Sequence, residues 1–411
     1  MRLYHALTRS RGSITNAYLR PARTISSCRI HATQPATITS CLGVGRKRTQ
    51  DARPRCQRYA PISRRSFFSE SLPAVLVPPA VFLSLLVGLW TYKCIMTVLF
   101  QDKIIYMPYM PPFARSEKME DYTAICKPVE WESLHVKSLD GTKIALAVGR
   151  LPERTCTDSA VQGKKRRIAI AYFHGNGSSI PPRLPLMSGT LKAIERASPD
   201  SDVEFVIVAL SYRGYWTSSG RASQAGIEKD AQAMLQWIQK TYEGAGVDLQ
   251  IMLWGQSIGS GVASTAAATY VTDRARDKPP LTALLLETPF TSIKSMLLAL
   301  YPQKWLPYKY LWPFLWNHWD SEVALQRIAE ADLRPEILLL PATRDEVVPR
   351  DEVDKLESIC KELGLPMKRK DIIGALHFEA TVRTDGQEAV ARFVADTIRS
   401  RESRAGTSRV R

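Results

Sequence analysis

The chain has few histidines, and its cysteines do not cluster. Six histidines and seven cysteines occur in 411 residues, with no C-x-x-C pair and no Cys/His group. Structural zinc sites are built from such groups, so the sequence predicts no metal, and none of its motifs implies a cofactor. Only three cysteines follow residue 100, too few for the disulfide framework of a small secreted protein.

Most of the chain also lacks a strong charge of either sign. The formal net charge is +16, but residues 1–71 alone carry 14 Lys and Arg against two Asp and Glu. The remaining 340 residues carry 42 basic and 38 acidic side chains. A nucleic-acid-binding body concentrates basic residues on one face or along one helix. The near balance of charge therefore argues against nucleic acid as a partner.

Acidic residues are absent from the first 50 positions, which are rich in Arg, Ser and Thr. Four apolar side chains there fit one face of an early helix: Leu3, Leu7, Ile14 and Tyr18. This composition resembles a mitochondrial transit peptide, and residues 64–69 (RRSFFS) resemble a processing site. The alternatives are a basic disordered tail or a wrongly assigned start codon. We expect residues 1–70 to be a targeting or disordered extension, with the mitochondrion as destination and the endoplasmic reticulum as the alternative.

Charged residues are also missing from Ser71 through Tyr92, a run dominated by Val, Leu, Ala and Phe. It is long enough to cross a hydrocarbon core of about 30 Å. Pro78 and Pro79 are expected to delay the helix, so the predicted span runs from about Pro79 to Phe100 within an anchor at 71–100. The alternative is a buried or re-entrant hairpin. The preceding basic residues favour a body that faces the intermembrane space or a lumen.

Short apolar runs alternate with helical patterns from about residue 127 onward. A strand pair over 130–151 turns at Asp140-Gly141, a hairpin signal. Further buried strands are expected at 168–173, 203–210, 249–254, 281–286 and 337–340. Helices are expected at about 184–197, 227–242, 257–272, 351–363 and 387–401. This order predicts an α/β fold, a mostly parallel sheet with helices on both faces, in a body spanning 101–402 with a disordered tail at 403–411.

Ser257 lies in the run Gly255-Gln256-Ser257-Ile258-Gly259, which has the G-x-S-x-G form of a nucleophile elbow. The pentapeptide alone is a weak signal, but here a buried strand precedes it and a helix of small residues follows. The two glycines permit the sharp turn that exposes a serine hydroxyl at a strand end. The sequence therefore predicts Ser257 as a nucleophile.

A serine nucleophile needs a histidine base and an acid that orients the histidine. In hydrolases built on a strand–turn–helix elbow, the acid follows the serine and the histidine comes last. Only His318 and His377 follow Ser257, and His318 lies in an aromatic insertion, so His377 is the predicted base. Asp345, just past the strand at 337–340, is the predicted acid. Glu346 and Asp371 are the alternatives, the latter expected within the last strand.

The loop His174-Gly175-Asn176-Gly177-Ser178 follows a predicted strand and is rich in glycine. An oxyanion hole needs two backbone N–H donors close to the reacting carbonyl. We predict the N–H of Ile258, directly after the nucleophile, and that of Asn176. His174 is expected to brace the loop rather than act as a base.

Six motifs occur in one order along about residues 95–402 and together resemble the α/β-hydrolase superfamily. The similarity is greatest to its membrane-anchored serine hydrolases, the bud-emergence-type proteins and the lysophosphatidylserine-lipase group. The resemblance implies a Ser257–Asp345–His377 triad with Asn176 and Ile258 as oxyanion donors. One departure is Trp216, where relatives often have a small residue. The motifs are His174–Gly177, Ser211–Tyr215, Gly255–Gly259, Glu287–Ser292, Asp345–Pro349 and His377.

An insertion at about 291–331 is expected to be a short aromatic-rich lid. Four of the nine tryptophans lie there. The rings are interpreted either as an acyl pocket or a membrane-facing cap, or as packing between lid and body. Its aromatic residues are Tyr301, Trp305, Tyr308, Tyr310, Trp312, Phe314, Trp316 and Trp319.

These features predict a membrane-anchored serine hydrolase that cleaves acyl esters, with a lipid or lysophospholipid as the favoured substrate. A different hypothesis is a catalytically silent membrane scaffold on a hydrolase fold, since fold does not fix function. A complete set of three separated triad residues argues against the scaffold. A thioesterase or peptidase of the same fold is a third hypothesis, because ester, thioester and amide substrates use the same residues.

Overall fold

A central sheet of eight strands organises the computed structural model, which describes residues 73–152, 165–198, 203–273, 278–304, 306–332 and 334–409. The predictions for residues 1–70 lie outside the described residues. The strands are β1 (Glu130–Lys137), β2 (Lys143–Arg150), β3 (Lys165–Phe173), β4 (Val203–Ser211), β5 (Val247–Gln256), β6 (Leu281–Glu287), β7 (Glu336–Leu340) and β8 (Met367–Arg369).

The sheet order is β1-β2-β4-β3-β5-β6-β7-β8. β2 pairs antiparallel with β1 and β4, and the pairs from β4 across to β8 are parallel. Gly141 turns the β1–β2 hairpin with a φ of 83°, a conformation open to glycine. Because parallel strands end at one edge of a sheet, the loops after β3, β5, β6, β7 and β8 meet there.

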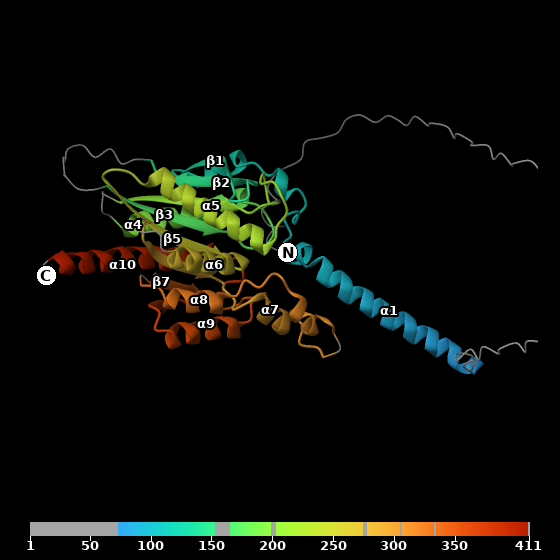
Figure 1. Cartoon of the computed structure of the whole chain (residues 1–411). Coiled ribbons are helices and arrows are strands. Elements are labelled where there is room, and N and C mark those ends of the chain that lie inside the picture. The colour runs from blue at the N-terminus through green and yellow to red at the C-terminus, as the bar shows by residue number, and fades with distance from the viewer. Residues whose placement is uncertain are drawn as a thin grey trace, which may run out of the picture. The chain divides into compact units, whose positions relative to one another are not determined.

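Helices cover both faces of the sheet, as the sequence predicts (Figure 1). α4 and α10 contribute to the core on one face, and α5, α6, α8 and α9 to the core on the other. Their bounds are α4 (Leu184–Ala197), α5 (Gln224–Tyr242), α6 (Ile258–Thr272), α8 (Ser321–Ala329), α9 (Arg350–Glu362) and α10 (Thr384–Arg409).

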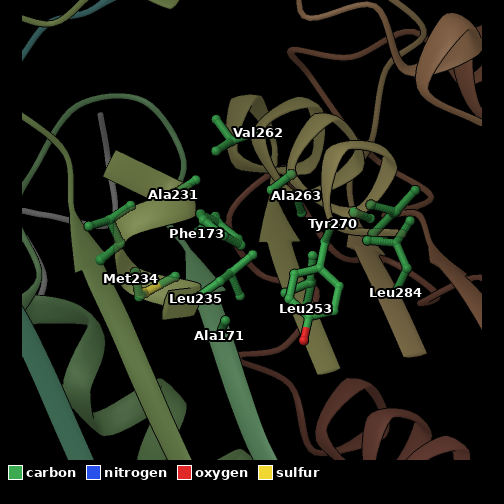
Figure 2. Close-up of a cluster of buried hydrophobic side chains, with 14 of the residues drawn as sticks. Ala171, Phe173, Ala231, Met234, Leu235, Leu253, Val262, Ala263, Tyr270 and Leu284 are labelled. Carbon is green, nitrogen blue, oxygen red and sulfur yellow. The ribbon is translucent and has the colours of Figure 1, made fainter. Parts of the chain in front are cut away.

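Alternating side chains of the central strands fill the two cores, because neighbouring residues of a strand point to opposite faces. In β3, Phe173 belongs to the core with α5 and α6, whereas Tyr172 belongs to the core with α4 and α10. Figure 2 shows Phe173 and Leu253 of the sheet in one cluster with Leu235 of α5 and Val262 of α6. The prediction of a two-sided, mostly parallel sheet is confirmed.

Two differences from the expected boundaries lie near the C-terminal end of the chain. β8 ends at Arg369, so Asp371 lies past the last strand rather than within it. α10 continues to Arg409 instead of ending near 401, and a helix therefore occupies most of the expected tail. No proline occurs between residues 387 and 411, so nothing in that sequence forces the helix to stop.

An apolar helix precedes the body: α1 (Val77–Leu99), with a 3-10 turn at Ala74–Leu76 before it. Within the described residues, this segment is the one helix long and apolar enough to cross a membrane. The expected delay by Pro78 and Pro79 is wrong, because both prolines lie in the first turn of α1. First-turn N–H groups have no partner inside a helix, so proline is tolerated there.

The lid expected at 291–331 contains α7 (Ile293–Leu300), two short 3-10 turns and α8. Between α1 and β1 lie two further helices, α2 (Gln101–Ile105) and α3 (Glu120–Cys126).

Candidate active site

Ser257 occupies the turn between β5 and α6, with a φ of 53° and a ψ of −121°. Such a conformation is costly for a residue with a side chain and persists only where its surroundings enforce it. The backbone N–H of Ser257 donates to the carbonyl of Glu287 at 2.9 Å, and its carbonyl accepts from Ser260 N at 2.8 Å. The turn is therefore held from both sides.

The packing around Gly255 and Gly259 leaves no room for a side chain at either position. A Cβ on Gly255 would lie 2.2 Å from the carbonyl oxygen of Gly259, and one on Gly259 would lie 2.1 Å from that of Phe173. Both contacts are far inside van der Waals distance and involve backbone atoms. The G-x-S-x-G spacing therefore follows from the close approach of α6 to the ends of β3 and β5.

Hydrogen bonds join Ser257, His377 and Asp345. His377 Nε2 lies 2.8 Å from Ser257 Oγ, and its Nδ1 lies 2.8 Å from Asp345 Oδ2. Asp345 Oδ1 also accepts from the backbone N–H groups of Val347 and Val348, at 2.9 and 2.8 Å. A carboxylate so fixed accepts the Nδ1–H of the imidazole, which leaves Nε2 free to accept from the serine. All three side chains are largely buried.

The two alternative acids lie elsewhere. Glu346 Oε2 accepts from the backbone N–H of His377 at 3.0 Å, so it holds the histidine loop without contacting the ring. Asp371 pairs with Arg369 at 2.7 Å and contacts Arg350. His318 belongs to the lid, where its backbone N–H donates to Gln224 Oε1. The catalytic role of Asp345 stays a prediction, but neither rival carboxylate is hydrogen bonded to the imidazole.

The loop after β3 lies against the serine turn. A Cβ on Gly175 would stand 3.4 Å from the Cβ of Ser257. Asn176 Oδ1 accepts from Gly177 N, Met107 N and Tyr215 Oη at 2.8, 3.2 and 3.1 Å, which fixes the loop. Among the hydrogen bonds of the described residues, none uses the backbone N–H of Asn176 or of Ile258.

Arg183 braces this loop, and sequence reasoning did not find it. Its guanidinium donates to Gln256 Oε1 at 2.5 Å and to the carbonyls of Gly175 and Gly177 at 3.4 and 3.3 Å. The carbonyls that point toward Arg183 cannot also point into the site. Arg183 lies at the start of α4 rather than in a recognisable motif, so its partners depend on the folded chain.

His174 is fully buried beside this loop. Its Nδ1–H donates to the carbonyl of Gly175 at 2.7 Å, and its ring stacks on Tyr212 with centroids 4.1 Å apart. Burial first, and then the nearby Arg183 cation, lower the pKa of His174 to about 3. The ring therefore stays neutral, and its contacts agree with a bracing role rather than with base catalysis.

Glu287 is a buried carboxylate directly beside the serine turn. It accepts hydrogen bonds from Trp254 Nε1, Gln256 Nε2 and both the N–H and the hydroxyl of Thr381, at 3.0, 3.2, 3.2 and 2.7 Å. Burial raises its pKa, and these donors oppose that shift. Glu287 links β5, β6 and the loop before α10, so it is a framework residue. Glu287 opens one of the six sequence motifs, Glu287–Ser292, but the sequence alone assigned it no role.

Trp216, the departure from the expected pattern, has a φ of 39° and is buried. Its Nε1 donates to the carbonyl of Glu117 at 2.9 Å, and its own carbonyl accepts from Arg115. The ring therefore packs beneath the 115–117 segment and does not contact the triad through these bonds.

In the part of the chain that the structure describes, no group of three or more His, Cys, Asp and Glu is arranged to hold a metal ion.

The chain is similar in sequence and fold to several known proteins. Over 199 residues the chain is 27% identical to protein bem46 of Schizosaccharomyces pombe, covering 48% of this chain and 58% of that protein. It is 29% identical over 262 residues to the α/β-hydrolase domain-containing protein WAV2 of Arabidopsis thaliana, covering 61% and 73%. It is 30% identical over 185 residues to lysophosphatidylserine lipase ABHD12 of Danio rerio, covering 44% of each.

The chain thus spans between about half and three quarters of these relatives. An α/β hydrolase from Vibrio vulnificus superposes with a TM-score of 0.51 at 18% identity, covering 73% of this chain and 92% of that one. No protein-family model matches the chain. The fold is that of an α/β hydrolase, and the resemblance stated from the sequence motifs is confirmed.

Proposed function

We propose that the protein is a membrane-anchored serine hydrolase that cleaves acyl esters through an acyl-enzyme. The proposal rests above all on one chain of hydrogen bonds, from Ser257 Oγ to His377 Nε2 and from His377 Nδ1 to Asp345. This chain supplies a nucleophile, a base and an orienting acid in the arrangement that acyl transfer requires.

In the first half-reaction, Ser257 Oγ attacks the ester carbonyl while His377 Nε2 takes the serine proton. Asp345 stays ionised, holds the Nδ1–H tautomer and stabilises the imidazolium that forms. The carbonyl oxygen becomes an oxyanion, for which the N–H groups of Ile258 and Asn176 are the proposed donors. Collapse of this intermediate expels the alcohol, which receives its proton from His377 Nε2, and leaves an acyl group on Ser257.

In the second half-reaction, water attacks the acyl-enzyme. His377 Nε2 takes a proton from the water, and the same two N–H groups stabilise the second oxyanion. The bond to Ser257 Oγ then breaks, the serine regains its proton from His377, and the free acid leaves. One water is consumed and one ester bond is broken in each turnover.

A lipid or lysophospholipid ester is the favoured substrate. One relative is named a lysophosphatidylserine lipase, and the chain carries an apolar helix that suits a membrane. Because the similarity covers 44% of that relative, the lipid class is part of the proposal. The same residues would serve a thioester, and competition between ester and thioester substrates would separate these two activities.

The proposal is tested by a fluorophosphonate probe, which reacts with an activated serine. The full-length protein should be labelled, and Ser257→Ala should abolish both labelling and ester turnover, by as much as about 10⁶-fold for a lost serine nucleophile. Ser264→Ala is the matched control, since Ser264 is buried in α6, the helix that follows Ser257, and lies outside the triad. A wild-type protein that stays unlabelled would favour the scaffold hypothesis.

A further inference from the structure

The lid carries large aromatic side chains that are exposed. Five of these residues are 39% to 60% exposed. We call these rings the lid face: Tyr301, Tyr310, Trp312, Phe314 and Trp316. Large exposed apolar surface on a protein marks an interaction site. Packing between lid and body, one of the roles that the sequence left open, does not account for the exposure of these five residues.

Hydrogen bonds hold the lid at both ends. At its start, Glu352 of α9 accepts from Thr291 N at 3.0 Å and from Ser295 Oγ at 2.5 Å. At its end, buried Trp319 donates from Nε1 to Tyr106 Oη at 2.7 Å, and Tyr106 donates to Asn317 Oδ1 at 3.0 Å. The exposed rings between these points are thus presented by a lid fixed to the body.

The chain that leaves α1 is bonded directly to the lid face. Gln101 Nε2 donates to the carbonyl of Phe314 at 3.1 Å, and Gln101 Oε1 accepts from Trp316 N at 2.9 Å. Asp102 Oδ1 accepts from Trp316 Nε1 at 3.0 Å and from Asn317 Nδ2 at 2.6 Å. The lid face is therefore continuous with the end of the predicted membrane helix.

A second contact sets the level of the lid along α1. Lys93 Nζ lies 5.3 Å from the ring centroid of Tyr308. Lys93 precedes the last residue of α1, Leu99, by six positions, which is about 9 Å along the helix axis. It is also the first charged residue after the uncharged run 71–92. The lid thus meets α1 at the one charged residue of that helix, close to the end that joins the body. A lysine near the end of a spanning helix reaches the headgroup level of the bilayer.

The chemistry of the lid face suits that level. Trp and Tyr concentrate at membrane interfaces because their rings are apolar at one end and polar at the other. Lys294 Nζ lies over the ring of Trp312 at 3.7 Å, and Lys304 is exposed. Lysines beside interfacial rings can reach phosphate groups while their stems stay on apolar surface.

We propose that the lid face inserts into the headgroup boundary of the same bilayer that holds α1. The inference rests on the membrane anchor of the proposed function and adds a second, monotopic contact. A lipid ester in that leaflet would then lie next to the lid of the enzyme that hydrolyses it.

The test uses full-length protein in vesicles whose lipids carry a photoactivatable diazirine on an acyl chain. After irradiation, tryptic peptides are compared by mass spectrometry. Peptide 310–327 contains most of the lid face, peptide 66–93 most of α1, and peptide 119–137 contains Ile125. Ile125 is 67% exposed and lies in α3, which leads into the start of β1. That start is at the edge of the sheet opposite Ser257, so Ile125 is an exposed apolar control.

We expect labelling of peptides 66–93 and 310–327 well above that of peptide 119–137. Trp312→Asp should lose most of the lid labelling and keep that of α1, whereas Ile125→Asp should change neither. Labelled α1 with a lid no more labelled than peptide 119–137 would overturn the inference alone. An unlabelled α1 would overturn the anchor and, with an unlabelled lid, the inference as well. Lid labelling without α1 labelling would support the lid contact and refute the anchor.

Discussion

Acid should destabilise this protein through His174, whose ring is completely buried next to the loop after β3. Its Nδ1–H is bonded to Gly175 O, and Nε2 has no partner among the described atoms. Protonation would place a second N–H in that unpartnered position, close to the Arg183 cation. Burial and Arg183 accordingly lower the pKa of His174 to about 3, whereas an unfolded histidine has a pKa of about 6.5.

The sign and size of the effect follow from proton linkage. Between the two pKa values the unfolded chain binds a proton that the folded protein excludes, so stability falls as pH falls below about 6.5. Each pH unit in that range changes the free energy of unfolding by about 1.4 kcal/mol. At pH 5.0 the loss from His174 is about 2 kcal/mol relative to pH 7.5. This loss of stability at pH 5.0 is nearly the same for any pKa of His174 in the folded protein below about 4.

Urea unfolding of the detergent-solubilised protein at pH 7.5 and pH 5.0 measures this loss, with His174→Phe as the comparison. The phenyl ring keeps an aromatic contact with Tyr212 and cannot titrate. The variant is expected to lose about 2 kcal/mol less stability than wild type over this pH interval, whatever its stability at pH 7.5. Equal losses in the two proteins would refute the assignment of His174 as a neutral buried brace.

Three further predictions concern the triad, the turn and the extension. Asp345→Asn should lower the rate of ester hydrolysis by about 10⁴-fold, as for other triad acids. Glu346→Gln should have little effect, because its amide oxygen can still accept from a backbone N–H. If a kinetic assay found the larger loss in Glu346→Gln, the acid would be misassigned. Gly259→Ala should lower the free energy of unfolding by about 1–3 kcal/mol or more, because its Cβ would lie 2.1 Å from a β3 carbonyl oxygen. Gly244→Ala, whose Cβ would have nothing within 4 Å, should leave the urea midpoint nearly unchanged. Equal midpoint shifts in the two variants would contradict this account. A reporter fused to residues 1–70 should enter mitochondria by fluorescence microscopy, and an endoplasmic-reticulum pattern would point to a signal-anchored enzyme instead.

The strands and the loops that carry the triad were predictable from local pattern. The apolar runs that became β3 to β7 are bounded by polar or glycine-rich loops, and the sheet edge then brings those loops together. The start of α1 was predicted incorrectly because Pro78 and Pro79 were treated as helix breakers, although the first helical turn tolerates proline. Asp371 was placed in the last strand because β8 is only three residues long, too short for an alternating pattern.

The supporting contacts could not be predicted from local pattern, because they join distant parts of the chain. Arg183 reaches Gln256 across 73 positions, and Asp102 reaches Trp316 across 214. Neither arginine at the start of a helix nor aspartate after an apolar helix carries a signal for its partner. Such pairings exist only once the sheet has ordered its strands, so they belong to tertiary structure rather than to motif.

The strained turn at Ser257 is also the place where the sequence motif is clearest. Ser257 has a φ of 53°, a conformation that costs of order 1–3 kcal/mol for a residue with a side chain. The strain is offset by two glycines without Cβ atoms, which the nucleophile motif includes. It is also offset by the carboxylate of Glu287, a residue that opens the motif Glu287–Ser292 but was given no role from the sequence. That carboxylate holds Trp254 and Gln256 of β5 while the backbone of the same residue accepts from Ser257 N. In this chain the turn at Ser257 therefore rests on a polar anchor, and that anchor is the acidic residue at the end of the neighbouring buried strand β6.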